Sequence, residues 1–137
     1  MQLWNREYPA SLAYDSIESF DAYISSLIDA RHVLIQSKEG IIQGWYFDFL
    51  RDGNRNFGML LDARIQGAGV GSELLRRSKV SNSELHGWAV ESSKYKKMDG
   101  TFYKSPIDFY RKNGFEIIPE VQFTTEQLTA IKIQWTL

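Results

Sequence analysis

The sequence predicts one domain of the mixed α+β class (α/β in the broader sense), in which a mixed, mostly antiparallel sheet is flanked by helices. Three observations support this prediction. The whole chain, residues 1–137, has a length that one hydrophobic core can organise. Segments with a helical spacing of apolar residues alternate with segments in which apolar residues recur at every second position. Tight turns separate the first strand-like segments, and such turns join antiparallel neighbours.

The first half of the chain predicts a helix followed by three strands. Ser16, preceded by Asp15, is a good N-cap for a helix with an apolar stripe. The stripe consists of Ile17, Phe20, Ile24, Leu27 and Ile28. Strands are expected at residues 32–36, 41–50 and 57–61, with turns at 38–40 and 52–54 between them. These three strands form an antiparallel meander.

The second half predicts a helix, a strand, a second helix and a closing pair of strands. The first of these helices follows a glycine-rich segment and has apolar residues on one side. Ser105 as the cap and Pro106 as the first helical residue open the second helix, and Asn113-Gly114 closes it. Strands are expected at residues 85–90, 115–123 and 130–135, and a polar connection spans residues 92–104.

The composition narrows the class of partner. Sixteen Lys and Arg residues against seventeen Asp and Glu residues give a formal net charge of −1, so no nucleic-acid or anionic-membrane partner is expected. The chain has no cysteine and only two histidines, so no metal is expected. His32 and His86 fall in strand-like segments and are expected to be packed or paired structural residues. No apolar run reaches the length of a membrane span and no secretory signal is visible, so the expected location is the cytoplasm.

The segment Gln66-Gly67-Ala68-Gly69-Val70-Gly71 is the densest functional signal, and it lies between a predicted strand and a predicted helix. The first N–H groups of a helix have no intrahelical partner and carry partial positive charge. A tight glycine turn directs these groups toward one point, where they can bind a phosphate or diphosphate. The alternative interpretation is a tight connection that binds no ligand.

Two common phosphate-binding motifs fit this segment poorly. A P-loop requires a lysine after its last glycine, whereas Ser72 follows Gly71. A dinucleotide fingerprint requires a third glycine where Ser72 stands, although Glu91 lies at a suitable distance for the acidic residue. That fold also begins with a parallel strand, and here an antiparallel meander comes first. A small nucleotide-binding protein is therefore a minor alternative.

Gln66-x-x-Gly69-x-Gly71 resembles the Gln/Arg-x-x-Gly-x-Gly/Ala signature of the GCN5-related N-acetyltransferases, the GNAT family. Residues 109–115, Phe-Tyr-Arg-Lys-Asn-Gly-Phe, are similar to the second marker of that family, an aromatic-Tyr pair ahead of Gly-Phe. The order of elements from Ser16 onward also resembles the family. The resemblance implies a GNAT-like central sheet and the transfer of an acetyl group from acetyl-CoA to an amine by direct attack.

The resemblance also implies roles for individual residues. Tyr110 stands at the family's general-acid position and would protonate the departing thiolate, since a tyrosine pKa of about 10 exceeds a thiol pKa of about 8.5. Backbone groups of Met59 and Leu61 would meet the pantetheine arm. The amides that would bind the diphosphate of acetyl-CoA belong to Gln66, Gly67, Gly69, Val70, Gly71 and Ser72. Lys94, Lys96 and Lys97 are expected to form a solvated loop face, with the cofactor's 3′-phosphate as an alternative contact.

The sequence leaves the general base and the acceptor open. An amine with a pKa of about 10.4 is almost fully protonated at pH 7, and a carboxylate usually takes its proton. Glu91, at the carboxyl end of its strand, is the first candidate, Asp62 and Asp48 are rivals, and a desolvated amine with no dedicated base is the remaining possibility. The expected acceptor is a small-molecule or peptide amine. The alternative function is a non-catalytic acyl-CoA-binding sensor or partner module of the same fold, and exposed edge strands favour a homodimer.

Overall fold

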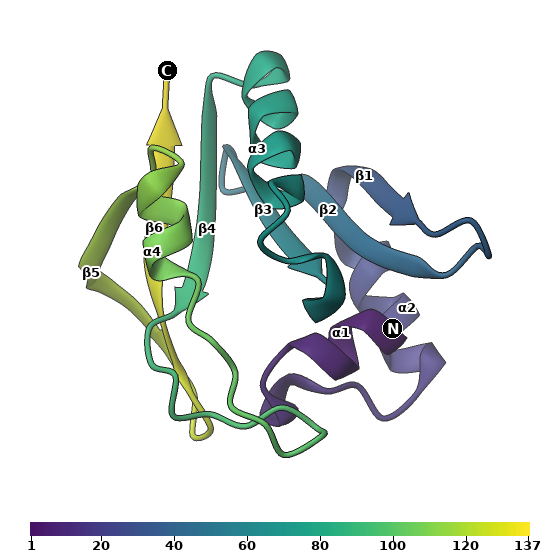
Figure 1. Cartoon of the computed structure of the whole chain (residues 1–137). Coiled ribbons are helices and arrows are strands. Elements are labelled where there is room, and N and C mark those ends of the chain that lie inside the picture. Colours follow the sequence, from purple (N-terminus) through teal and green to yellow (C-terminus); the bar gives the residue numbers. More distant parts are fainter.

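A six-stranded sheet forms the centre of the protein, and the computed structural model describes all 137 residues (Figure 1). The strands are β1 (Ile28–Gln36), β2 (Ile42–Arg51), β3 (Asn54–Leu61), β4 (Glu84–Val90), β5 (Glu116–Thr124) and β6 (Thr129–Thr136). Their order in the sheet is β1-β2-β3-β4-β6-β5, and every neighbouring pair is antiparallel except β3 and β4. The predicted mixed, mostly antiparallel sheet is confirmed.

Four helices flank the sheet, and two larger cores and one small cluster (Val90, Leu128 and Ala130) fill the space between. The helices are α1 (Gln2–Glu7), α2 (Ile17–Ser26), α3 (Val70–Ser81) and α4 (Ile107–Lys112), with short 3₁₀ turns at Ala10–Leu12 and Ala63–Ile65. Side chains alternate along β2, so Tyr46 and Trp45 enter different cores. Tyr46 packs with α3 and α4, whereas Trp45 and Phe47 pack with α1 and α2. The middle of β2 is consequently buried on both faces.

The predicted cap of the α2 helix is confirmed, and its predicted end is wrong. The Ser16 Oγ accepts a hydrogen bond from the Ser19 N–H at 3.1 Å. The helix ends at Ser26, so Leu27 is the C-cap and Ile28 already pairs with Leu50 of β2. The apolar spacing continues past Ser26 because both the helix and the strand that follows it contribute apolar residues.

The α4 helix begins one residue later than predicted. Pro106 is its N-cap rather than its first helical residue, so Ser105 precedes the cap position. The Ser105 hydroxyl accepts a long hydrogen bond from the Ile107 N–H, at 3.5 Å, and donates one to the carbonyl oxygen of Val90, at 2.7 Å. This bond ties the start of α4 to the end of β4. Gly114, with a φ of +85°, ends the helix as predicted.

The α1 helix is an element that the sequence pattern did not predict. It buries Leu3, Trp4 and Glu7 against the sheet. The Glu7 carboxylate accepts a hydrogen bond from the Ala63 N–H at 2.9 Å and forms an ion pair with Lys97 at 3.2 Å. The prediction of a solvated lysine face on residues 92–104 is therefore wrong for Lys97, whose side chain is only 14% exposed.

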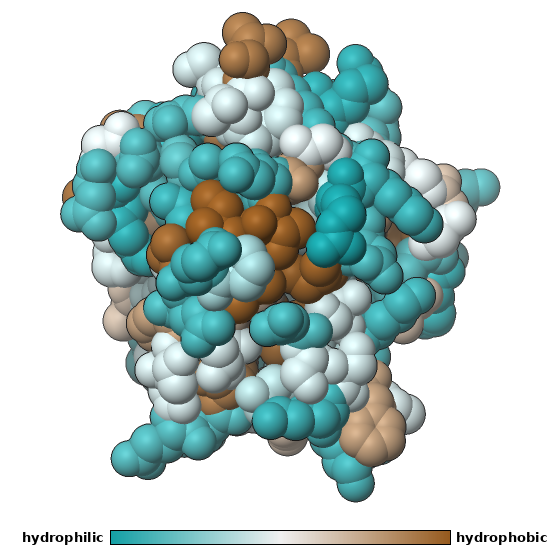
Figure 2. All heavy atoms as spheres, turned by 90° about the vertical axis from the view of Figure 1, so that its left-hand side faces the viewer, coloured by the Kyte–Doolittle hydropathy of each residue, from teal (hydrophilic) through white to brown (hydrophobic).

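The outer surfaces of the sheet edges are partly apolar. Figure 2, which faces the β5 side of the molecule, shows apolar side chains gathered in the middle of this surface and bordered by polar ones. Val121 and Phe123 of β5 are exposed, and the Phe123 ring lies 6.1 Å from that of Trp88. No helix of the structure has the length and apolar character needed to cross a membrane.

Candidate active site

The strands β3 and β4 separate along their length and open a gap in the middle of the sheet. Asn56 and His86 form the one register pair between them, and Figure 1 shows the strands diverging toward the ends that carry Leu61 and Val90. The Asp62 N–H donates a hydrogen bond to the carbonyl oxygen of Gln43 in β2, at 2.8 Å. Because hydrogen bonding alternates along an antiparallel pair, the backbone groups of Met59 and Leu61 point toward the gap. Met59 and Leu61, the predicted pantetheine contacts, thus lie on a strand edge that β4 does not pair, although the Leu61 carbonyl accepts a hydrogen bond from the Gln66 side chain.

The glycine loop between β3 and α3 presents a run of free backbone donors. None of the N–H groups from Gln66 to Ser72 donates a hydrogen bond within the chain. Gly67 and Gly69 have φ values of +80° and +82°, in the left-handed region that glycine adopts at least cost. The Gln66 side chain donates from Nε2 to the Leu61 carbonyl at 3.0 Å and fixes the loop to the end of β3. These donors lie at the positive end of α3.

Gly71 brings the start of α3 close to both β3 and α4. A Cβ at this position would lie 2.9 Å from the Phe109 Cζ and 3.1 Å from the Leu61 Cδ1. Only glycine allows this approach without displacing the Phe109 ring. The contact connects the loop to the helix that carries Tyr110, so the two sequence motifs meet in the structure.

A cavity of about 160 Å³ lies at the gap. Its aromatic lining includes Trp4, Tyr8, Tyr23, Phe47, Phe49 and Trp88, and Met59 and Tyr110 also border it. Arg51 is the one charged residue in its lining. The cavity therefore suits an apolar group and contains no carboxylate.

Tyr110 is placed where a proton donor to this cavity would stand. Its ring packs against Phe57 and Phe115, and the residue is buried. Burial raises the pKa of the Tyr110 hydroxyl above its ordinary value of 10.0, so the hydroxyl stays protonated at neutral pH. The hydroxyl oxygen has no hydrogen bond within the chain, and protein atoms do not enclose it completely. It consequently opens onto the cavity.

The carboxylates that the sequence proposed as bases differ in their availability. Asp62 is buried and forms ion pairs with Arg64 at 2.6 Å and Arg6 at 3.0 Å. Hydrogen bonds from Arg64 lower the pKa of the Asp62 carboxyl to about 2, which makes it a poor proton acceptor. Glu91 is exposed immediately after β4, and no ion pair engages it. Glu91 does not line the cavity.

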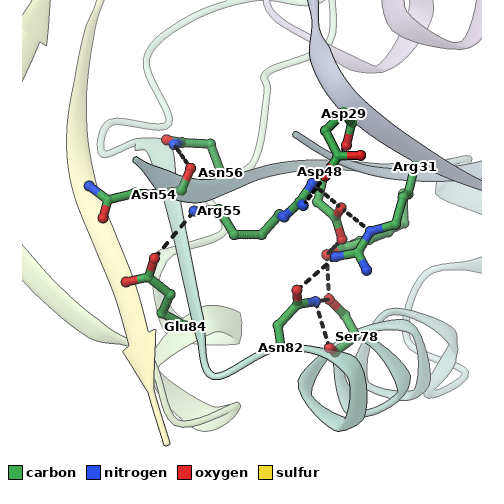
Figure 3. A network of polar contacts seen from close by, with 10 residues as sticks. Asp29, Arg31, Asp48, Asn54, Arg55, Asn56, Ser78, Asn82 and Glu84 are labelled. Atoms are coloured by element: carbon green, nitrogen blue, oxygen red, sulfur yellow. Dashed lines mark hydrogen bonds and ion pairs between the residues drawn. The ribbon is translucent and has the colours of Figure 1, made fainter. Parts of the chain in front are cut away.

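Asp48 belongs to a buried polar network away from the cavity (Figure 3). Its carboxylate accepts hydrogen bonds from Arg31 at 2.8 Å, Arg55 at 3.2 Å and the Tyr46 hydroxyl at 2.8 Å. Tyr46 also hydrogen-bonds to Ser78 in α3. A carboxylate with these partners links β1, β2, β3 and α3, which is a structural task.

A second, polar cavity of about 140 Å³ adjoins the first, sharing Arg51, Asn56 and Trp88 with it. His86 and Lys132 also line it. His86 is buried, and its Nε2 lies 2.9 Å from a Glu84 carboxylate oxygen. His32 accepts a hydrogen bond from the Trp45 indole at 3.0 Å. Both histidines are thus paired, as predicted, although the buried Nδ1 of His86 has no partner.

Comparisons with solved structures identify the fold. An aminoglycoside 6′-N-acetyltransferase complexed with coenzyme A aligns with a TM-score of 0.68 and 11% identity, covering 98% of this chain and 87% of the other. A GCN5-related N-acetyltransferase from Kribbella flavida aligns with a TM-score of 0.59 and 16% identity, over 97% and 83% of the two chains. This chain has the GNAT fold. No model of a known protein family and no curated protein matches the sequence.

Acceptors differ among the proteins that share the GNAT fold. A spermidine N-acetyltransferase chimera from Vibrio cholerae and hSSAT aligns with a TM-score of 0.61 and 13% identity, over 98% of this chain and 85% of the other. Aminoglycosides and spermidine are different amines. The GNAT fold therefore does not specify the acceptor.

The residues that the sequence missed belong to the lining of the aromatic cavity. Trp4, Tyr8, Tyr23, Arg51 and Trp88 line the cavity but come from four different elements. No spacing rule joins residues that are this far apart in the sequence. The period-two alternation in β4 was the one available signal, because it places Trp88 on the face opposite Ala89.

Proposed function

We propose that the chain transfers an acetyl group from acetyl-CoA to the nitrogen of a small amine. The observation that carries this proposal is the run of free N–H groups from Gln66 to Ser72 beside the β3–β4 gap. Free amides at a helix start bind a diphosphate, and an unpaired strand edge can bind the amide groups of a pantetheine arm. Gln66, Gly67, Gly69, Val70, Gly71 and Ser72 would hold the diphosphate, and Met59 and Leu61 the arm.

Tyr110 would supply the proton that the reaction needs. The amine nitrogen bonds to the acetyl carbon, the carbon–sulfur bond breaks, and the Tyr110 hydroxyl transfers its proton to sulfur. The proton lost by the amine restores the tyrosine through water. Burial raises the pKa of Tyr110, so its hydroxyl is protonated at the start of each cycle and readily takes up a proton after the transfer. No metal is proposed, and no group of three or more metal-ligating side chains occurs in the structure.

Glu91 is the carboxylate that we propose for deprotonating the amine, through a water, because Asp48 and Asp62 are held in ion pairs. Replacing Glu91 with glutamine should lower kcat by at least tenfold and leave the affinity for acetyl-CoA unchanged. Steady-state rates with Glu126→Gln, which removes another exposed carboxylate, provide the control. Equal rates in the two variants would favour the desolvated amine without a base.

The glycine loop permits a matched test of coenzyme binding. Gly69→Ala and Gly40→Ala introduce the same methyl group at a φ of +82°, with nothing within 4 Å at either site. Each should lose about 1–2 kcal/mol of stability from the left-handed backbone. Only Gly69→Ala should weaken coenzyme A binding in calorimetry, by about tenfold, since Gly40 lies in the β1–β2 turn.

The same measurement separates the proposal from its alternatives. Heat of binding from coenzyme A, together with thiol release in the presence of amines, supports the transferase. Binding of acetyl-CoA with no thiol release from any amine would favour the acyl-CoA-binding sensor. If the folded chain does not bind coenzyme A, the proposal is wrong. If Gly69→Ala binds coenzyme A as tightly as the unmodified chain, the coenzyme binds elsewhere than at the loop.

A further inference from the structure

Arg51 differs from every other arginine in the chain. The other seven each form an ion pair with an Asp or Glu carboxylate within 4.0 Å, at 2.6 to 3.2 Å. Arg51 has no such partner, and its guanidinium carbon lies 5.0 Å from the centroid of the Phe49 ring. A guanidinium on an aromatic face keeps its edge free for hydrogen bonds. Arg51 also lines both cavities at the gap.

Lys132 adds a second unpaired cation to the same place. It lies on β6 opposite Trp88 of β4, lines the polar cavity, and forms no ion pair within the chain. The acidic groups nearby are Asp52, which lines the cavity on the β2–β3 turn, and Glu84, which is engaged by His86 and by the Arg55 N–H. Two cations with open donors thus face a concave polar site.

The aromatic cavity can hold one ammonium group against its aromatic faces, but it offers no anionic partner for several of them. Its lining contains no carboxylate, and its one charge is the Arg51 guanidinium. A polyamine or aminoglycoside carries several ammonium groups, which would lose hydration there and meet a like charge. An acceptor with one amine and an apolar body would fit the aromatic cavity, and an anionic end on the same molecule would fit the polar cavity beside it.

We infer that the acceptor is an amino-acid-like amine whose carboxylate binds at Arg51 and Lys132 while its amine enters the aromatic cavity. The inference rests on the proposed function, which makes these two cavities the site of the acceptor. An arginine can bind a carboxylate through two parallel N–H···O bonds, as Arg64 does with Asp62 and Arg76 does with Glu73 in this chain. The apolar part of the substrate would rest between Phe49 and Trp88, which border the cavity with Arg51.

The test compares acceptors that differ only in the carboxylate. Leucine against isoamylamine, and phenylalanine against phenethylamine, should show kcat/KM values about ten- to hundredfold higher for the amino acids, as expected for charged hydrogen bonds. Arg51→Met should reduce this ratio by about tenfold or more, and Lys132→Met should reduce it by less. Arg76→Met, which breaks an exposed ion pair on α3, should keep it. A ratio at or below one in the unmodified chain, or a higher kcat/KM for spermidine, would overturn the inference.

A binding measurement distinguishes this failure from failure of the proposed function. Trp4 and Trp88 line the cavity, so their fluorescence can report titration with N-acetylphenylalanine and N-acetylphenethylamine. Tighter binding of the carboxylate compound, lost in Arg51→Met, supports the inference even in a chain that releases no thiol. Equal binding of both compounds, or of neither, overturns it even in a chain that acetylates amines.

Discussion

Replacing Tyr110 with phenylalanine should lower kcat by about 10²–10⁴-fold and leave the affinity for coenzyme A nearly unchanged. The substitution removes one hydroxyl that has no hydrogen bond within the chain, and it retains the ring that packs between Phe57 and Phe115. Folding should therefore be preserved while the proton for the departing thiolate is lost. Single-turnover rates and calorimetry on the same preparation measure the two quantities separately.

The pH profile provides a second readout for Tyr110. A general acid is active while it is protonated, and burial raises the pKa of this hydroxyl above 10.0. The contribution of Tyr110 should thus be complete at neutral pH and decline only as the pH rises through its raised pKa. Between pH 7 and pH 10 the ratio of rates between the unmodified chain and Tyr110→Phe should stay constant.

Tyr8 is the matched control for this experiment. It lines the same cavity, and burial likewise raises its pKa, so Tyr8→Phe removes a similar hydroxyl from the opposite wall. A large loss in Tyr110→Phe with a small loss in Tyr8→Phe assigns the acid to α4. The reverse order would transfer the role to α1, and small losses in both would exclude a tyrosine from proton transfer.

Signals in the sequence predicted the parts of the site that depend on local backbone geometry. Gly67 and Gly69 adopt the left-handed conformation that the loop requires, and the spacing of the two motifs brought Gly71 against Phe109. Ser16 capped its helix because a hydroxyl can reach the N–H three residues later without help from the rest of the fold. The backbone conformation of the loop and the Ser16 cap depend on residues close in sequence, whereas the Gly71–Phe109 approach joins α3 to α4.

The remaining part of the site depends on contacts between distant segments. The six residues of α1 are too few to show a helical period, and packing of Leu3 and Trp4 on the sheet stabilises the helix. The unpaired state of Arg51 is visible only once the partners of the other arginines are known. Lys97 looked solvated in sequence because Glu7, its partner, is separated from it by most of the chain.

Replacing Asp48 with asparagine should lower the free energy of unfolding by roughly 3 kcal/mol, at the low end of the range for breaking a buried ion pair. The carboxylate is only 3% exposed, and it balances Arg55, whose side chain is 13% exposed, together with the more accessible Arg31. An asparagine would retain one acceptor oxygen and turn its amide donors toward these cations. Chemical denaturation with urea measures the change directly.

The control for Asp48 is Asp108→Asn, which removes a carboxylate from an ion pair with Arg111 on the surface of α4. The Asp108 side chain is 87% exposed, so water replaces the lost partner and the stability should stay close to that of the unmodified chain. Asp48→Asn should lose more because Arg55, at 13% exposed, and the buried Tyr46 have little access to water. If both variants are equally stable, the cations around Asp48 are solvated in the folded chain. The end of α3 would then be held to the sheet by the apolar packing of Leu74 and Leu75 together with the Tyr46–Ser78 and Arg31–Asn82 hydrogen bonds.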